Sequence, residues 1–165
     1  AEAAAVMALV IAKTEPSCTV MAFGETFVPM PVSPEMSLEQ VLSAAEKLRR
    51  TVQPGGTDCS VPMQWALREQ LLAQQMGGAG AAPPVSYDCF VVFTDNETWS
   101  GDIQPVDALR RYRQSSGVAD ARLVTVGMAS NGFSIADPED TGMLDVVGFD
   151  TSAPEVIANS AAGRI

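Results

Sequence analysis

Apolar residues recur along the chain in two patterns, one with the spacing of a helix face and one nearly continuous. The helical spacing predicts five helices, over residues 1–15, 37–50, 61–75, 107–116 and 153–162. The continuous runs are short and rich in β-branched residues, and they predict strands over residues 88–93, 121–127 and 145–149. Because these runs are apolar on both faces, we expect parallel, central strands that helices cover on both sides.

Two more apolar runs, residues 18–23 and 26–32, flank a Gly-Glu pair that suits a tight turn. They favour a β-hairpin, and Pro29 and Pro31 confine its second arm to the edge of a sheet because proline has no N–H to donate. Strands that alternate with helices predict an α/β fold with a doubly wound, mostly parallel sheet. We therefore expect helices on both faces of the sheet and an antiparallel edge strand.

Length and composition predict a single domain. The chain has 165 residues, of which 47% are apolar, enough to bury one sizeable core. The opening helix resembles a signal peptide, but its apolar core is short and Glu2 stands where a basic residue is expected. No segment is long and apolar enough to span a membrane. Because the chain begins inside this helix without an N-cap, we expect a segment upstream of Ala1.

The charge and the missing residue types narrow the chemistry. The net charge is −10, so the chain repels polyanions and gains little from phosphate counterion release. There is no histidine, which excludes Ser-His-Asp and Cys-His catalysis and most zinc sites. A bound metal would have to be a hard cation held by oxygen. Three cysteines without a CxxC pair favour a reducing, cytoplasmic location.

The stretch FVVFTDNETWSGD, residues 90–102, ends an apolar strand in a group of carboxylates. Asp95 falls beyond the carboxyl end of this strand, where ligands bind in doubly wound sheets. Thr57 lies in a Gly-Gly loop that opens a predicted helix and can reach the same rim. A carboxylate and a hydroxyl completed by water suit Mg²⁺. In the alternative, Thr57 and Asp58 cap the helix and Asp95 starts a turn.

Three segments, GGTDCSVPMQWA, VVFTDNETWSGD and GMASNGFSIADPEDTGMLDVVGFD, resemble the von Willebrand factor A domain of the Ro autoantigen family, whose members include bacterial Ro ribonucleoproteins. The resemblance covers residues 3–165. It implies a metal-ion-dependent adhesion site built from an Asp-x-Ser-x-Ser loop after the first strand, a threonine and an aspartate. Thr57 and Asp95 match the last two and are the implied ligands of Mg²⁺ or another divalent cation.

The Asp-x-Ser-x-Ser loop does not occur in these residues. We therefore expect the first strand to lie upstream, which leaves the domain at residues 1–165 incomplete at its N-terminus. Ro proteins join this domain to a ring of helical repeats that binds small Y RNAs and misfolded noncoding RNAs. The resemblance thus implies a cytoplasmic ribonucleoprotein in RNA quality control, not an enzyme, with that ring and an exoribonuclease as partners.

Two other functions stay open. The first is a von Willebrand A module that binds a protein partner in another assembly. The second is a magnesium-dependent phosphoryl-transfer enzyme, since such enzymes also place an aspartate after a parallel strand. Against the enzyme, the chain has no GxxxxGK[ST] loop, and its two lysines, Lys13 and Lys47, fall in predicted helices.

Three further groups have both a functional and a structural interpretation. An acidic run is interpreted either as a second cation site or as a solvated turn. It consists of Asp137, Glu139, Asp140 and Asp145. The only basic cluster has three interpretations: it binds an RNA phosphate, it pairs with an acidic neighbour, or it is the solvated face of a helix. Its residues are Arg110, Arg111 and Arg113. Trp65 has the helical spacing of a core residue, whereas Trp99 lies in the loop of Asp95, where it could stack a base.

Overall fold

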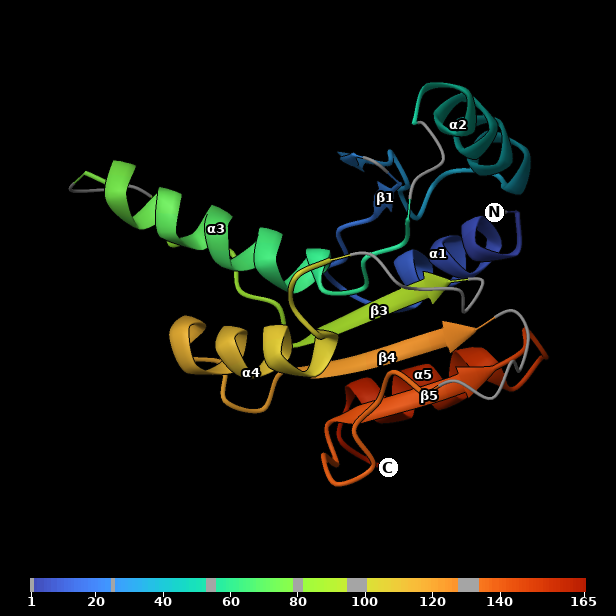
Figure 1. The fold of residues 1–165 in the computed structure, drawn as a ribbon. Helices are drawn as coiled ribbons and strands as arrows, with labels where there is room; N and C mark the ends of the chain where they lie inside the picture. The colour runs from blue at the N-terminus through green and yellow to red at the C-terminus, as the bar shows by residue number, and fades with distance from the viewer. Residues whose placement is uncertain (1, 25, 53–55, 79–81, 95–100, 128–133) are drawn as a thin grey trace. The chain divides into compact units, whose positions relative to one another are not determined.

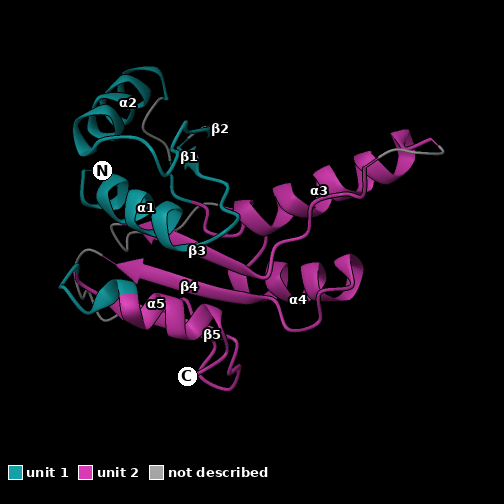
Figure 2. Cartoon of the chain, turned by 180° about the vertical axis from the view of Figure 1, so that it is seen from behind, with its two compact units in different colours: residues 1–57, 149–154 teal, residues 58–148, 155–165 magenta. Residues whose placement is uncertain are grey.

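The computed structural model describes residues 2–24, 26–52, 56–78, 82–94, 101–127 and 134–165. Ten elements follow one another along the described chain (Figure 1): α1 (Glu2–Thr14), β1 (Met21–Phe23), β2 (Phe27–Pro29), α2 (Leu38–Thr51), α3 (Val61–Met76), β3 (Cys89–Thr94), α4 (Pro105–Ser116), β4 (Arg122–Gly127), β5 (Met143–Val147) and α5 (Ala153–Ala161). They divide into two compact units, residues 1–57 with 149–154 and residues 58–148 with 155–165 (Figure 2).

The first unit holds two helices and a hairpin. Ala5 and Leu9 of α1 pack against Val41 of α2, and these three side chains are buried. The predicted cap of α2 is confirmed: the Ser37 N–H donates to Gln40 Oε1 over 2.8 Å, and the Gln40 N–H donates to Ser37 Oγ over 3.2 Å. This capping box fixes where α2 begins.

The predicted hairpin forms as an antiparallel pair, with Met21 opposite Pro29 and Phe23 opposite Phe27. Among the described strands, β1 and β2 make a two-stranded sheet of their own, whereas we expected an antiparallel edge on the main sheet. Pro29 ends β2 and offers no N–H for a further partner. The hairpin is therefore short and belongs to the first unit.

The second unit contains a parallel sheet in the order β3-β4-β5. Both faces of β4 are covered, because every residue from Leu123 to Gly127 is buried. Comparison of Figures 1 and 2 shows α5 on one face of this sheet. On β3, Phe90 meets the ring of Tyr112 from α4 at a centroid distance of 4.9 Å. The predicted α/β fold with a doubly wound parallel sheet is thus confirmed.

Two details of the predicted strands differ. Among the described strands β5 lies at an edge although a central position was expected, whereas the second neighbour of β3 is expected from the upstream strand and stays a prediction. In addition, β5 begins at Met143, two residues before the predicted start at Asp145. The acidic residue suggested a strand boundary, but its carboxylate accepts hydrogen bonds within the protein and is tolerated inside the strand.

Aromatic rings connect α3 and α4 near the amino end of β3. The rings of Trp65 and Tyr87 lie 6.2 Å apart, and those of Tyr87 and Phe90 lie 5.9 Å apart. The hydroxyl of fully buried Tyr112 accepts a hydrogen bond of 2.7 Å from the Tyr87 N–H, and burial raises the pKa of this phenol. Trp65, expected in the core, is a half-buried packing residue at its edge.

None of the helices in the described part of the chain is long and apolar enough to cross a membrane.

Candidate functional site

The loop before α3 is built around Asp58. Its Oδ1 accepts hydrogen bonds from the N–H of Ser60, over 2.9 Å, and from the Ser60 hydroxyl. Its carbonyl oxygen accepts the N–H of Val61, the first residue of α3, over 3.2 Å. The Ser60 oxygen in turn accepts a bond of 2.6 Å from the side-chain amide of Gln64. These bonds fix the turn that starts the helix.

Asp58 thus shapes the turn before α3, but the N-cap residue of α3 is Ser60 and no side chain caps the helix, so the predicted cap by Thr57 and Asp58 is not formed. Thr57 is half-buried, and among the described residues its hydroxyl makes none of these bonds. Because Asp58 takes the turn-forming role, the hydroxyl of Thr57 is not needed to start α3. The predicted assignment of Thr57 to a cation stays a prediction.

Asp58 also touches the segment that follows β3. Gly101 has a φ of +116°, which side-chain-bearing residues rarely adopt, and a Cβ there would overlap the Asp58 carboxylate. The loop before α3 and the segment after β3 are thus in direct contact at Asp58 and Gly101. Asp95 and Trp99 lie outside the described residues, so their predicted roles stay predictions.

The donor chemistry near this contact suits a hard cation. A threonine hydroxyl and aspartate carboxylates are the oxygen donors that Mg²⁺ and Ca²⁺ prefer. Within the described part of the chain, however, no three Asp, Glu, Cys or His side chains gather into a metal-binding group. A cation bound at Thr57 and Asp95 would therefore need further oxygen ligands.

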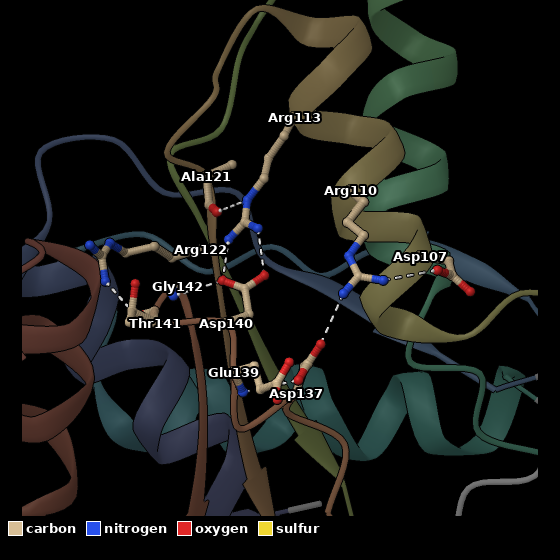
Figure 3. Close-up of polar contacts among 10 residues, drawn as sticks. All are labelled: Asp107, Arg110, Arg113, Ala121, Arg122, Asp137, Glu139, Asp140, Thr141 and Gly142. Atoms are coloured by element: carbon tan, nitrogen blue, oxygen red, sulfur yellow. Dashed lines mark hydrogen bonds and ion pairs between the residues drawn. The ribbon is translucent and has the colours of Figure 1, made fainter.

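The acidic run is engaged in a network with the arginines of α4 (Figure 3). Arg113 binds Asp140 through both terminal nitrogens, over 2.6 and 3.1 Å, and donates from Nε to the carbonyl of Ala121 over 2.8 Å. Asp140 also accepts the N–H of Gly142 over 2.9 Å. Both charged side chains are largely buried, and hydrogen bonds from Arg113 lower the pKa of Asp140.

A second, more exposed pair lies beside it. Arg110 donates to Asp137 over 2.9 Å and lies 3.6 Å from Asp107 on its own helix. Asp137 also accepts the N–H of Glu139 over 3.0 Å, which shapes the turn before β5. The acidic neighbour expected for the arginine cluster is thus confirmed for Arg110 and Arg113, while Arg111 lies exposed.

Comparisons with known proteins agree on one family. The family model described as the Ro60 vWA domain matches residues 1–161. The chain belongs to the Ro60 vWA domain family. It is 41% identical over 163 residues to the RNA-binding protein RO60 of Deinococcus radiodurans and 34% identical over 164 residues to the RNA-binding protein RO60 of Caenorhabditis elegans. The crystal structure of the D. radiodurans RO (RSR) protein matches 99% of the chain with a TM-score of 0.78 and 40% identity.

These relatives are much longer than the matched region. Each match covers 99% of this chain but only 27% of the D. radiodurans protein and 23% of the C. elegans protein. The crystallised RO protein is covered over 29% of its chain. The Ro60 vWA domain therefore accounts for about a quarter of each relative.

The segment that carries the resemblance to Ro proteins has a structural role in this Ro60 vWA domain. Asp145, inside β5, accepts hydrogen bonds from the Ser134 hydroxyl and from the N–H groups of Ile135, over 2.9 Å, and Ala136, over 3.0 Å. These bonds hold the segment before β5 against the strand. Asp137, Asp140 and Asp145 thus serve the fold of this segment.

A second basic cluster escaped the sequence analysis. Lys47, Arg49 and Arg50 lie exposed at the end of α2. Arg49 and Arg50 both bind Glu46, through their Nε atoms over 2.8 and 3.0 Å, and they lower the pKa of Glu46 to about 2. The signal was the string EKLRR, which we interpreted only as the end of an amphipathic helix.

Proposed function

We propose that this chain is the metal-binding domain of a Ro-type RNA-binding protein that binds Y RNA and misfolded noncoding RNAs in cytoplasmic RNA quality control. The observation that carries the proposal is the match to the Ro60 vWA domain over residues 1–161. It is supported by relatives named as RNA-binding proteins at 41% and 34% identity. We assign the RNA affinity to a ring of helical repeats in the same polypeptide, and an exoribonuclease is the proposed protein partner.

The charges of the described residues support the assignment of RNA binding to the ring and not to this domain. RNA affinity depends on several Lys or Arg side chains that each neutralise a phosphate. With a net charge of −10, the chain offers few such groups. Arg113 and Arg110 are already bound to Asp140 and Asp137, so α4 has lost most of its capacity to bind phosphate. A short basic end on α2 cannot offset the surrounding negative charge.

For the metal, we propose Thr57 and Asp95 as ligands of Mg²⁺ or another divalent cation. The contact of Asp58 with Gly101 supports this, because it joins the residue after Thr57 to the segment after β3. The remaining ligands would come from an Asp-x-Ser-x-Ser loop outside these residues. When bound, the cation would offer an open coordination position to an oxygen of a partner. We propose no catalytic role for the domain.

A salt titration of RNA binding tests the assignment of RNA affinity. Labelled Y RNA is titrated in gel shifts with the full-length protein and with residues 1–165. We expect the full-length protein to bind, with an affinity that falls steeply as salt rises, and the isolated domain to show no measurable binding at physiological salt. Tight binding by the isolated domain would contradict the assignment of the RNA site to the ring. Absence of binding by both proteins would refute the Ro-type function.

Calorimetry with Mn²⁺ or Mg²⁺ tests the metal site in the full-length protein. Asp95→Asn is expected to abolish cation binding with little effect on thermal unfolding, because a carboxylate that serves as a cation ligand contributes more to the ion than to the core. Asp88→Asn is the matched control, since Asp88 is exposed just before the amino end of β3. Equal cation affinity in the two variants would exclude Asp95 as a ligand.

A further inference from the structure

Two turns of the chain share one set of hydrogen bonds, the turn before α3 and the turn before α5. Asp58 Oδ1 accepts the N–H of Ser60 over 2.9 Å, and Asp150 Oδ1 accepts the N–H of Ser152 over the same distance. In each turn the same oxygen also accepts the serine hydroxyl, and the aspartate carbonyl accepts the first N–H of the helix over 3.2 Å. These bonds are sufficient to shape a turn before a helix.

Asp58 differs from Asp150 in what lies beside its carboxylate. A Cβ added to Gly101 would overlap the Asp58 carboxylate, and its nearest atom would be Oδ2, the oxygen that accepts neither bond from Ser60. Asp58 is half-buried, whereas Asp150 lies exposed. The side chain of Asp58 therefore does more than shape its own turn, because it also packs against the connection between β3 and α4.

The Asp58 carboxylate is held from two sides. On one side is Ser60, which is fully buried and also accepts the amide of Gln64 over 2.6 Å, so it has little freedom to move. On the other side is the backbone of Gly101, which leaves room for the carboxylate only because glycine has no Cβ. The loop before α3 and the segment after β3 are thus locked together through one carboxylate.

This contact joins the two chain segments that carry the proposed cation ligands. Thr57 is linked to Asp58 by a peptide bond, and Gly101 follows Asp95 in the connection between β3 and α4. Ligand side chains bind a cation tightly only when neighbouring groups hold them in position. Loss of such a neighbouring group typically lowers metal affinity by roughly 10- to 100-fold. The Asp58 carboxylate is placed to have this effect on the loop of Thr57.

We infer that Asp58 is a positioning residue for the cation site at Thr57 and Asp95, an inference that rests on the proposed function. Asp58 does not bind the ion itself. Its carboxylate locks the loop before α3 against the segment after β3, and this contact holds the Thr57 hydroxyl in place for the cation. Gly101 belongs to the same arrangement, because it makes room for the carboxylate. One carboxylate oxygen bound in a turn and the other packed against a backbone suit positioning better than ligation.

Calorimetric titration of the full-length protein with Mn²⁺ or Mg²⁺ tests this role. Asp58→Ala should lower the cation affinity by about tenfold or more, whereas Asp58→Asn keeps the shape of the side chain and an acceptor oxygen and should keep most of the affinity. Asp150→Ala is the matched control, because it removes the same turn bonds before α5, and its cation affinity should equal that of the wild type. Thermal unfolding checks that each variant is folded at the temperature of the titration.

Gly101→Ala tests the same role without removing an oxygen atom. It should lower the cation affinity to a similar extent, because the new Cβ displaces the Asp58 carboxylate. Unchanged affinity in either Asp58→Ala or Gly101→Ala would overturn the inference. A loss in Asp58→Asn as large as in Asp58→Ala would overturn it as well, since the charge would then act as a ligand. Cation binding that Asp95→Asn abolishes but Asp58→Ala leaves intact would refute this inference alone, whereas a wild-type protein that binds no cation would refute the proposed cation site together with it.

Discussion

The ion pair between Arg113 and Asp140 should be a main stabilising contact of the second unit. Asp140→Ala removes both bonds to the guanidinium and the bond to the Gly142 N–H, while Arg113 stays 18% exposed with two unpaired terminal nitrogens. Breaking a buried pair by removing one partner costs about 3–5 kcal/mol, and the residual exposure of this pair lowers the expected loss to about 2–4 kcal/mol. Urea unfolding at pH 7, followed by circular dichroism, measures it.

Two comparisons separate this explanation from a general effect of losing a carboxylate. Glu46→Ala also removes a carboxylate that binds guanidinium groups, but its pairs with Arg49 and Arg50 lie on the surface, so the unfolding midpoint of this variant should hardly change. Adding Arg113→Met to Asp140→Ala should recover part of the loss, because the unpaired buried charge is gone. A midpoint of Asp140→Ala equal to that of Glu46→Ala would refute the reasoning.

The pH dependence gives an independent check on the same pair. Because Arg113 lowers the pKa of Asp140 in the folded protein, the unfolded chain binds the proton more readily, and the pair stabilises the fold above the ordinary aspartate pKa of about 4. This contribution should disappear as the pH falls through the lowered pKa. The difference in unfolding free energy between wild type and Asp140→Ala should thus shrink only in acid.

Two further substitutions test the loops. Gly101→Ala should destabilise the fold by about 1–3 kcal/mol, since the new Cβ overlaps the Asp58 carboxylate and the φ of +116° is unfavourable for alanine. In thermal unfolding, adding Asp58→Ala to this variant should recover part of the lost stability. No recovery would contradict the contact between Gly101 and Asp58. Asp145→Ala should speed amide hydrogen exchange at Ile135 and Ala136, because their N–H groups lose the carboxylate that accepts their hydrogen bonds. Exchange in α2 should stay the same and serves as the control. If exchange at Ile135 also stays the same, Asp145 does not hold this segment.

Much of the fold could be predicted from local sequence patterns, because the tertiary contacts agree with the helices and strands that these patterns favour. The capping box of α2 and the apolar runs of β3 and β4 predicted these elements almost to the residue. The start of β5 was missed because a half-buried aspartate inside a strand depends on hydrogen-bond donors from another segment, which periodicity cannot reveal. The hairpin pairing itself is local, but whether a hairpin also joins the main sheet depends on long-range pairing, which the turn does not encode.

The site was less predictable than the fold. Sequence alone treated Thr57 and Asp58 as equivalent polar residues at a helix start, and only the bonds from Ser60 distinguish them. For the arginines of α4, spacing showed a helix face but not what lies opposite it, and the partners Asp137 and Asp140 are 27 residues further along the chain. Such pairings require the folded backbone.

These pairings change what the motif shared with Ro proteins means for RNA binding. Its aspartates neutralise arginines of α4 or hold the segment before β5, so much of the motif specifies a rigid turn in this domain. The same bonds occupy two cations that an RNA phosphate would need, and breaking either pair to reach RNA would leave a carboxylate beside the phosphate. The segment that resembles Ro proteins therefore identifies the family because it specifies part of the fold. The same segment argues against an RNA contact at these aspartates and at the arginines of α4. Any RNA contact from the described residues would have to come from exposed cations outside these two pairs, such as Arg111 and Lys47.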